Sequence, residues 1–200
     1  MVEYLLAPFI AYLLGSVSSA VVVSKLMKLP DPRTTGSKNP GATNVLRVGN
    51  KVAATLTLVG DLLKGTFAVV LGRVIDGDAI VLALAGLGVF LGHLYPLYFG
   101  FKGGKGVATA FGVYLGLAPW VAGVLLLTWV SVAAVTRYSS LAALVSAALS
   151  PVYVVWLIGN WPSVAMSGCI AGFLFVRHRS NIQRLLAGEE TRIGQPSDTP

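Results

Sequence analysis

The segment GSKNPGATN, at positions 36–44, carries residue types that can hold a phosphate group. Gly36 and Gly41 permit backbone conformations that other residues resist, and Pro40 fixes one dihedral angle. The residues that alternate with them have short hydrogen-bonding side chains or a positive charge: Ser37, Lys38, Asn39, Thr43 and Asn44. Such a loop can direct several donors at one anion, as backbone nests do. No acidic residue occurs between positions 32 and 60, so the segment predicts an anion site.

A second segment, GFKGGKG at positions 100–106, interleaves glycines with two lysines. Backbone N–H groups and ammonium groups together form phosphate-binding loops. The segment is not a Walker A motif, because its spacing is one residue short and Gly106 stands where Ser or Thr would hold magnesium. Each segment alone also fits a basic turn beside a membrane, but the two together favour an anion site. The contributors predicted from this segment are Gly103, Gly104 and Lys105.

The composition places these loops in a membrane protein. The chain is 55% hydrophobic and 12% charged, with a mean hydropathy of +0.76. Its apolar runs predict an all-α polytopic fold with seven transmembrane helices in a single domain of residues 1–200. The predicted spans are 2–27, 52–74, 79–99, 107–117, 120–136, 141–158 and 163–176. The fourth run is short, because a spanning helix needs about 20 residues, and Pro151 predicts a kink in the sixth.

The distribution of basic residues predicts the orientation. Every Lys and Arg except Lys64 and Arg73 falls in or beside the polar loops at about 28–51, 99–106 and 137–140, or in the tail at about 177–200. Cytoplasmic loops carry an excess of Lys and Arg, so these segments and the C-terminus are predicted to be cytoplasmic and the N-terminus outside. Both candidate anion-binding segments then lie on the cytoplasmic face.

The second apolar run carries two charged residues, Asp61 and Lys64, which share one face of a helix. Charges at membrane depth are costly unless they are paired or face a wet cavity. A neutralised pair that aids packing and a pair that lines a site both remain open. We expect His93 to pack or to support the Gly-Lys loop. The sequence shows no carboxylate cluster and a single cysteine, Cys169, so no metal site and no intrachain disulfide are predicted.

Four segments together resemble the PlsY family, the bacterial glycerol-3-phosphate acyltransferases that use acyl-phosphate. These are GSKNPGATNVLR, GHLYPLYFGFKGGKGVAT, and RYSSL with HRSNIQRLLAGEE, and the resemblance covers nearly the whole chain. It implies transfer of an acyl group from acyl-phosphate to the 1-hydroxyl of sn-glycerol 3-phosphate, giving lysophosphatidic acid and phosphate. It also implies a multi-pass protein of the bacterial inner membrane, with no cofactor and no nucleic acid partner. Docking of an upstream acyl-phosphate-forming enzyme on the cytoplasmic loops stays open.

The resemblance implies a site at the matching positions. The catalytic set is Ser37, Arg47, Lys105, His178 and Asn181. The substrate and phosphate contacts are Ser37, Asn39, Gly41, Thr43, Asn44, Arg47, Gly103, Gly104, Lys105, Ser140, His178 and Asn181. His178 and Asn181 are three residues apart, so one helical turn can present both. Because both substrates are anions, we expect a basic pocket without acidic side chains.

The sequence leaves the proton acceptor and two rival functions open. His178 can serve as a general base, or it can orient the glycerol hydroxyls while the phosphate of the donor accepts the proton. A transporter for a phosphorylated anion would use the same basic loops, but such transporters usually contain an internal repeat, which this sequence lacks. A scaffold for anionic lipids would need the charge, but not the particular placement of Gly, Asn and Ser.

Overall fold

The computed structural model describes residues 1–48 and 50–195. Position 49 of the predicted first loop and positions 196–200 of the predicted tail lie outside the described residues. Across the described ranges the chain is helical and contains no strand, which confirms the predicted all-α class. The elements are α1 (Glu3–Gly15), α2 (Ser19–Leu26), α3 (Ala42–Arg47), α4 (Lys51–Ile75), α5 (Ala79–Leu94), η1 (Leu97–Phe99), α6 (Val107–Leu117), α7 (Pro119–Thr136), α8 (Ser139–Leu157), α9 (Trp161–Arg177) and α10 (Arg179–Ala187).

Each of the predicted apolar runs is helical, but their lengths differ. Within the described residues, five stretches are long and apolar enough to cross a membrane: Glu3–Leu26, Lys51–Ile75, Ala79–Phe99, Pro119–Thr136 and Ser139–Leu157. The helices α6 and α9 are apolar but shorter, with 11 and 17 residues. The structure therefore supports five spans by length and composition, and the count of seven stays a prediction.

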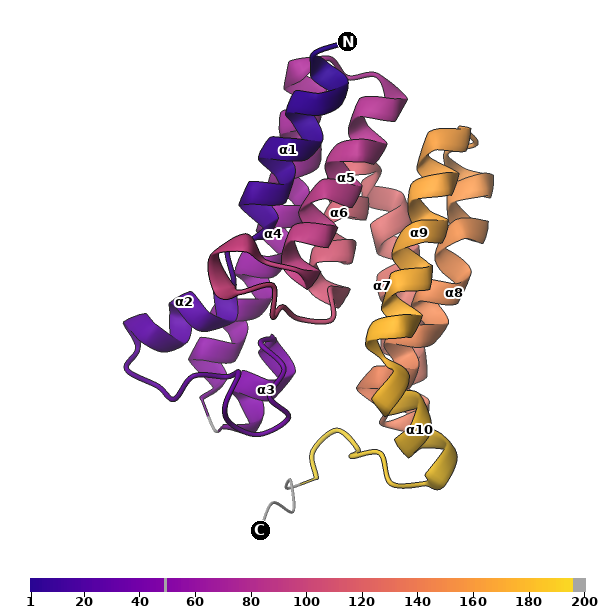
Figure 1. Ribbon diagram of the computed structural model, residues 1–200. Coiled ribbons are helices and arrows are strands. Elements are labelled where there is room, and N and C mark those ends of the chain that lie inside the picture. Colours follow the sequence, from indigo (N-terminus) through magenta and orange to yellow (C-terminus); the bar gives the residue numbers. More distant parts are fainter. Residues whose placement is uncertain (49, 196–200) are drawn as a thin grey trace.

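The first apolar run is interrupted, so the prediction of one continuous helix over 2–27 is wrong. Helix α1 ends at Gly15, Ser18 is extended, and α2 leaves in another direction (Figure 1). Gly15 lies so close to α5 that a Cβ on it would overlap the carbonyl group of Val89. The carbonyl of Val17, freed by the break, accepts a hydrogen bond of 2.8 Å from Nζ of Lys64. A distant lysine thus stabilises the interruption.

Helix α5 lies at the centre of the packing. It contacts α1, α4, α6 and α9, and α7 and α8 pack beside α6 and α9 (Figure 1). The largest fully buried side chains include Phe90 and Leu94 of α5 and Met166 and Ile170 of α9. Small residues permit the close approaches that membrane helices use; a Cβ on Gly112 of α6 would overlap the backbone of α4.

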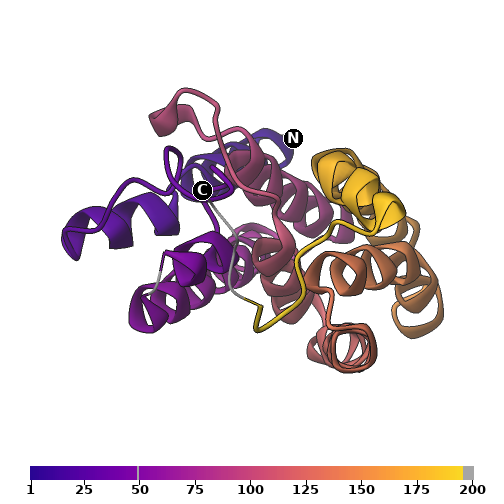
Figure 2. The same cartoon turned by 90° about the horizontal axis from the view of Figure 1, so that it is seen from below.

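The polar segments gather at one end of this bundle. Residues 27–48, the α7–α8 turn, α10 and residues 188–195 lie at the lower end in Figure 1, the α5–α6 loop lies at the lower end of α5, and these segments surround the bundle axis in Figure 2. The predicted gathering of the polar segments is therefore found, although they are far apart in sequence.

Candidate functional site

A cavity of about 520 Å³ extends from this polar end into the bundle. Its polar part is lined by many of the residues predicted from the sequence: Ser37, Asn39, Gly41, Thr43, Asn44, Arg47, Lys105, Ser140 and His178. Its apolar part is lined by side chains of α4, α6 and α7. One continuous space therefore joins a cationic, hydrogen-bonding end to a hydrophobic groove.

A chain of hydrogen bonds joins the α5–α6 loop to the tail. Nζ of Lys105 donates to Oδ1 of Asn181, and Nδ2 of Asn181 donates to Oε1 of Glu190 at 2.6 Å. The same carboxylate accepts from Oγ of Ser140 at 2.7 Å and from Nε of Arg184 at 2.7 Å. Glu190 is only 7% exposed and lines the cavity. It is the centre of a network whose other members the sequence partly identified.

The expectation of a pocket free of acidic side chains is wrong, because Glu190 and Asp61 both line it. Burial opposes ionisation of Glu190, but hydrogen bonds from Ser140, Asn181 and Arg184 outweigh it and lower the pKa of this carboxyl. A carboxylate is tolerated here because Arg184 pairs with it and Lys105 lies close enough to interact with its charge. Sequence reasoning assigned no role to Glu190, although it falls within the segment HRSNIQRLLAGEE.

The surroundings of Lys105 lower the pKa of its side chain. Burial lowers the pKa of its ammonium group to about 8, Glu190 raises it, and the charges of Arg184, Arg47 and Arg177 lower it further. An anion that binds beside Lys105 would stabilise the charged ammonium group and so raise its pKa again. Lys105 is therefore cationic at neutral pH but close to its titration range.

His178 is held between α9 and α10 with one ring nitrogen engaged. Nδ1 lies 2.8 Å from the carbonyl oxygen of Leu174, and since a carbonyl only accepts, Nδ1 must carry the hydrogen. Burial, and then the charge of Lys105, lower the pKa of His178 to about 4. At neutral pH the ring is neutral, and Nε2 can accept a hydrogen bond. Such a ring is a weak base but a good acceptor for a hydroxyl group.

Asn44 shapes the first loop from within. It is 1% exposed; its Oδ1 accepts from the backbone N–H of Ser37 at 2.8 Å, and its Nδ2 donates to the carbonyls of Pro32 and Thr35 at 2.8 and 3.0 Å. Gly36 adopts a φ of +56°, and a Cβ there would overlap Oδ1 of Asn44. The amide thus holds Ser37 in place, and because Asn44 also lines the cavity, its predicted contact with substrate stays a prediction.

Two arginines act differently at the site. Arg47, in the last turn of α3, lines the cavity, and its side chain makes no hydrogen bond or ion pair with another described residue. Arg177, which sequence reasoning missed, donates from Nε to the carbonyl of Gly104 at 3.1 Å and from Nη2 to that of Gly103 at 2.7 Å. Gly103 and Gly104 do not line the cavity; they are buried where the loop meets α5 and α9.

The charged residues of α4 form a buried cluster beside the cavity. Nζ of Lys64 lies 2.9 Å from Oδ1 of Asp61, and Nδ1 of His93 lies 3.5 Å from the same oxygen. Asp61 and His93 also line the cavity, so Asp61 is both neutralised by Lys64 and part of the lining. The cluster connects the break after α1, through Lys64, to the backbone of the Gly-Lys loop, since Gly104 donates to the carbonyl of His93 at 3.2 Å.

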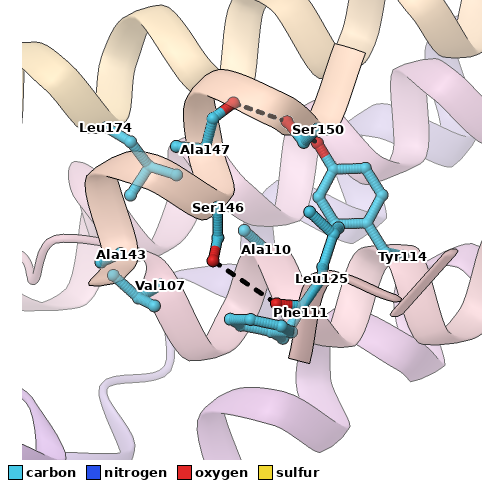
Figure 3. A pocket seen from close by; sticks show the side chains of 10 residues that line it. All are labelled: Val107, Ala110, Phe111, Tyr114, Leu125, Ala143, Ser146, Ala147, Ser150 and Leu174. Atoms are coloured by element: carbon cyan, nitrogen blue, oxygen red, sulfur yellow. Dashed lines mark hydrogen bonds between the residues drawn. The ribbon is translucent and has the colours of Figure 1, made fainter. Parts of the chain in front are cut away.

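A second cavity, of about 20 Å³, lies deeper between α6, α7, α8 and α9 (Figure 3). Beside it, the hydroxyl of Tyr114 is within hydrogen-bond distance of Ser150 (3.1 Å) and Ser167 (2.8 Å), and Ser146 donates to the carbonyl of Leu125 at 3.4 Å. These polar side chains satisfy one another and hold α6, α8 and α9 together. We assign this cluster to helix packing.

Known proteins are similar to this chain over nearly its whole length. Residues 5–188 match the family model described as glycerol-3-phosphate acyltransferase. The chain is 55% identical over 194 residues to the glycerol-3-phosphate acyltransferase of Methylococcus capsulatus, covering 96% of this chain and 97% of that protein. It is 58% identical over 200 residues to that of Burkholderia thailandensis, with the same coverage of 96% and 97%.

Two solved structures share the fold. One is the crystal structure of PlsY (YgiH), an integral membrane glycerol 3-phosphate acyltransferase, in its glycerol 3-phosphate form; the TM-score is 0.91 at 40% identity, with 96% of each chain covered. The other is the lysophosphatidic acid form, with a TM-score of 0.89 at 38% identity over 96% of this chain and 95% of that one.

Proposed function

Because the chain belongs to the family of glycerol-3-phosphate acyltransferases, we propose that it transfers the acyl group of a fatty acyl-phosphate to the 1-hydroxyl of sn-glycerol 3-phosphate. The products are lysophosphatidic acid and inorganic phosphate. One observation carries the proposal: a single cavity joins the cationic end at Lys105 and Arg47 to an apolar groove. Its natural occupants are phosphate groups at one end and a hydrocarbon chain at the other.

The role proposed for each polar residue follows from the hydrogen-bonding groups of its side chain and from their partners within the protein. Arg47 has no hydrogen-bond or ion-pair partner among the described residues, so its guanidinium can bind phosphate oxygens in a fork, and Lys105 supplies a point charge. Ser37, Asn39, Gly41 and Thr43 line the same end, and the side chains of Ser37, Asn39 and Thr43 are available to phosphate oxygens. Ser140 and Asn181 contact Glu190, and we assign them to holding Lys105 and the cavity wall in place as well as to binding substrate.

In the mechanism, the acceptor hydroxyl is oriented rather than deprotonated by the protein. The neutral His178, with its pKa lowered to about 4, accepts a hydrogen bond from the 1-hydroxyl of glycerol 3-phosphate. The hydroxyl oxygen attacks the acyl carbonyl carbon, the bond from this carbon to the phosphate oxygen breaks, and the proton passes to the departing phosphate. The protein supplies proximity and positive charge, which suits a donor that is already activated.

We further propose that the protein is a single domain that crosses the bacterial inner membrane seven times, with the N-terminus outside and the C-terminus in the cytoplasm. The gathering of the basic loops at the cavity end supports a cytoplasmic site. Its partners are then glycerol 3-phosphate, acyl-phosphate and the surrounding lipid. An upstream enzyme that forms acyl-phosphate can approach from the same face.

The test is acyl transfer by the purified protein in lipid, with glycerol 3-phosphate as acceptor and a chelator present. Acyl-phosphate, acyl-CoA and acyl-carrier protein are offered in parallel. We expect lysophosphatidic acid and phosphate from acyl-phosphate alone. Transfer from acyl-CoA only would overturn the donor assignment, and anion movement across vesicles without transfer would favour a transporter.

Substitution of Arg47 by Lys separates a geometric phosphate site from a merely basic surface, because Lys keeps the charge and loses the fork. We expect Arg47→Lys to reduce kcat/KM strongly. The exposed Arg179, which does not line the cavity, provides the matched control as Arg179→Lys. Equal activity of the two variants would argue against a phosphate contact at Arg47.

A further inference from the structure

The apolar part of the cavity is a groove between α4 and α7, which both pack against α6. Its lining comes from Leu58 and Leu62 of α4, Phe111 and Leu115 of α6, and Pro119, Ala122, Gly123, Leu126 and Trp129 of α7. Leu58 is 48% exposed and Leu126 is 52% exposed, so the groove is open along its side. A hydrocarbon chain attached to a phosphate at Lys105 can enter it directly from the bilayer.

The groove runs from the polar end toward the opposite end of the bundle. Val107, Phe111 and Leu115 line it from one face of α6 at intervals of four residues. With a helical rise of about 1.5 Å per residue, Leu115 lies about 12 Å farther from Lys105 than Val107 does. Helix α7 returns from Pro119, so Gly123 lies one turn from the deep end. Only a long acyl chain reaches its level.

Gly123 differs from the glycines that pack helices together. A Cβ on Gly112 or on Gly116 would meet atoms of α4, whereas a Cβ on Gly123 meets nothing within 4 Å. Glycine in a helix interior is unfavourable relative to alanine, and at Gly123 no neighbouring helix requires it. The space it leaves belongs to the groove.

We propose that Gly123 is a specificity-determining residue, which keeps the deep part of the groove open and so favours long acyl chains over short ones. The inference rests on the proposed function, since it assigns the groove to the acyl group of the donor. The binding free energy of a hydrocarbon chain grows with each methylene group taken out of water. A side chain at position 123 removes room for the methylene groups that lie deepest, and leaves the phosphate end untouched.

The test compares palmitoyl-phosphate with octanoyl-phosphate as donors for Gly123→Leu. The matched control is Gly172→Leu on α9, because Gly172 is exposed, has nothing within 4 Å of an added Cβ, and does not line the cavity. We expect the ratio of kcat/KM for palmitoyl-phosphate to that for octanoyl-phosphate to fall about tenfold in Gly123→Leu, the effect of losing roughly two buried methylene groups. Gly172→Leu keeps the wild-type ratio.

An unchanged ratio, or an equal loss with both donors, overturns the proposal. Thermal unfolding midpoints are measured for each variant, and Gly123→Ala and Gly123→Val extend the series in case the leucine does not fit. The ratio must then fall in order of side-chain size. If the wild-type protein transfers no acyl group of any length, the proposed function itself fails; if it does so and the ratio is flat across the series, only the role of Gly123 fails.

Discussion

Lys105 and Asn181 are 76 positions apart in the sequence, yet Nζ of the lysine donates a hydrogen bond to the amide oxygen of the asparagine. The contact joins the α5–α6 loop to α10. Nδ2 of the same asparagine donates a hydrogen bond to Glu190, so the side chain of Asn181 links the tail to the lysine. The position and the charge of Lys105 therefore depend on residues that follow the last apolar helix.

The titration of Lys105 predicts a fall in activity at alkaline pH. Burial lowers the pKa of its ammonium group to about 8, so the group is charged below this pH and neutral above it. We expect kcat/KM for glycerol 3-phosphate to be maintained below pH 8 and to decline as the pH rises through it. The decline in kcat should begin at a higher pH than the decline in kcat/KM, because bound phosphate raises the pKa of the ammonium group in the complex. Lys105→Arg, which stays charged, should lose the decline; an unaltered decline in this variant would assign it to another group.

Replacement of His178 separates orientation from proton removal. If the ring only orients the acceptor, His178→Ala raises KM for glycerol 3-phosphate about tenfold, the size of a lost hydrogen bond, with a smaller effect on kcat. Steady-state kinetics at saturating acyl-phosphate measure both quantities. The exposed neighbour Arg179, as Arg179→Ala, is the control. A collapse of kcat with unchanged KM would instead identify His178 as the base.

Two adjacent glutamates offer a direct test of the network around the tail. Glu190 is buried and accepts from Ser140, Asn181 and Arg184, whereas Glu189 is exposed. Glu190→Gln places an amide NH₂ against at least one of these donors, at a cost of about 1–3 kcal/mol in folding free energy. We expect a lower thermal midpoint and lower kcat/KM than for Glu189→Gln. Equal thermal midpoints and equal kcat/KM values for the two variants would show that the buried carboxylate contributes no more to stability or activity than the exposed one.

The buried cluster in α4 predicts non-additive effects on stability. Removing one member of a buried ion pair leaves an uncompensated charge and costs about 3–5 kcal/mol. Asp61→Asn and Lys64→Met are therefore each expected to destabilise strongly, and the double variant to cost less than their sum. Unfolding of the four proteins in detergent gives the coupling free energy. Strictly additive losses would mean that the 2.9 Å contact contributes nothing of its own.

The sequence predicted which segments meet, because glycine and basic residues mark loops and because every such loop returns to the same end of a helical bundle. It also selected Lys105 and Asn181, which a hydrogen bond joins, and His178, which lines the same cavity as Lys105. It did not select Glu190, since nothing local distinguishes this residue from Glu189. Only the turn after α10, at Gly188 with φ of +73°, brings Glu190 back to Ser140.

Two other features depend on partners that local sequence cannot reveal. The apolar run of 2–27 reads as one helix, but it is interrupted where Lys64, 47 positions away, binds the free carbonyl of Val17. The sequence predicts that Asn44 contacts substrate, but it does not reveal the three hydrogen bonds with the 32–37 segment by which Asn44 shapes the loop. In both cases the polar groups are the expected ones, and their partners are set by tertiary packing.

The network from Lys105 to Glu190 also has a consequence for biosynthesis. During translation, the loop that contains Lys105 emerges well before α10 and the tail, as segments of a chain appear in order. Until Asn181 and Glu190 have left the ribosome, the lysine has neither its amide partner nor the carboxylate that favours its charge. A nascent chain therefore cannot form the network around Lys105 until α10 and Glu190 have been synthesised.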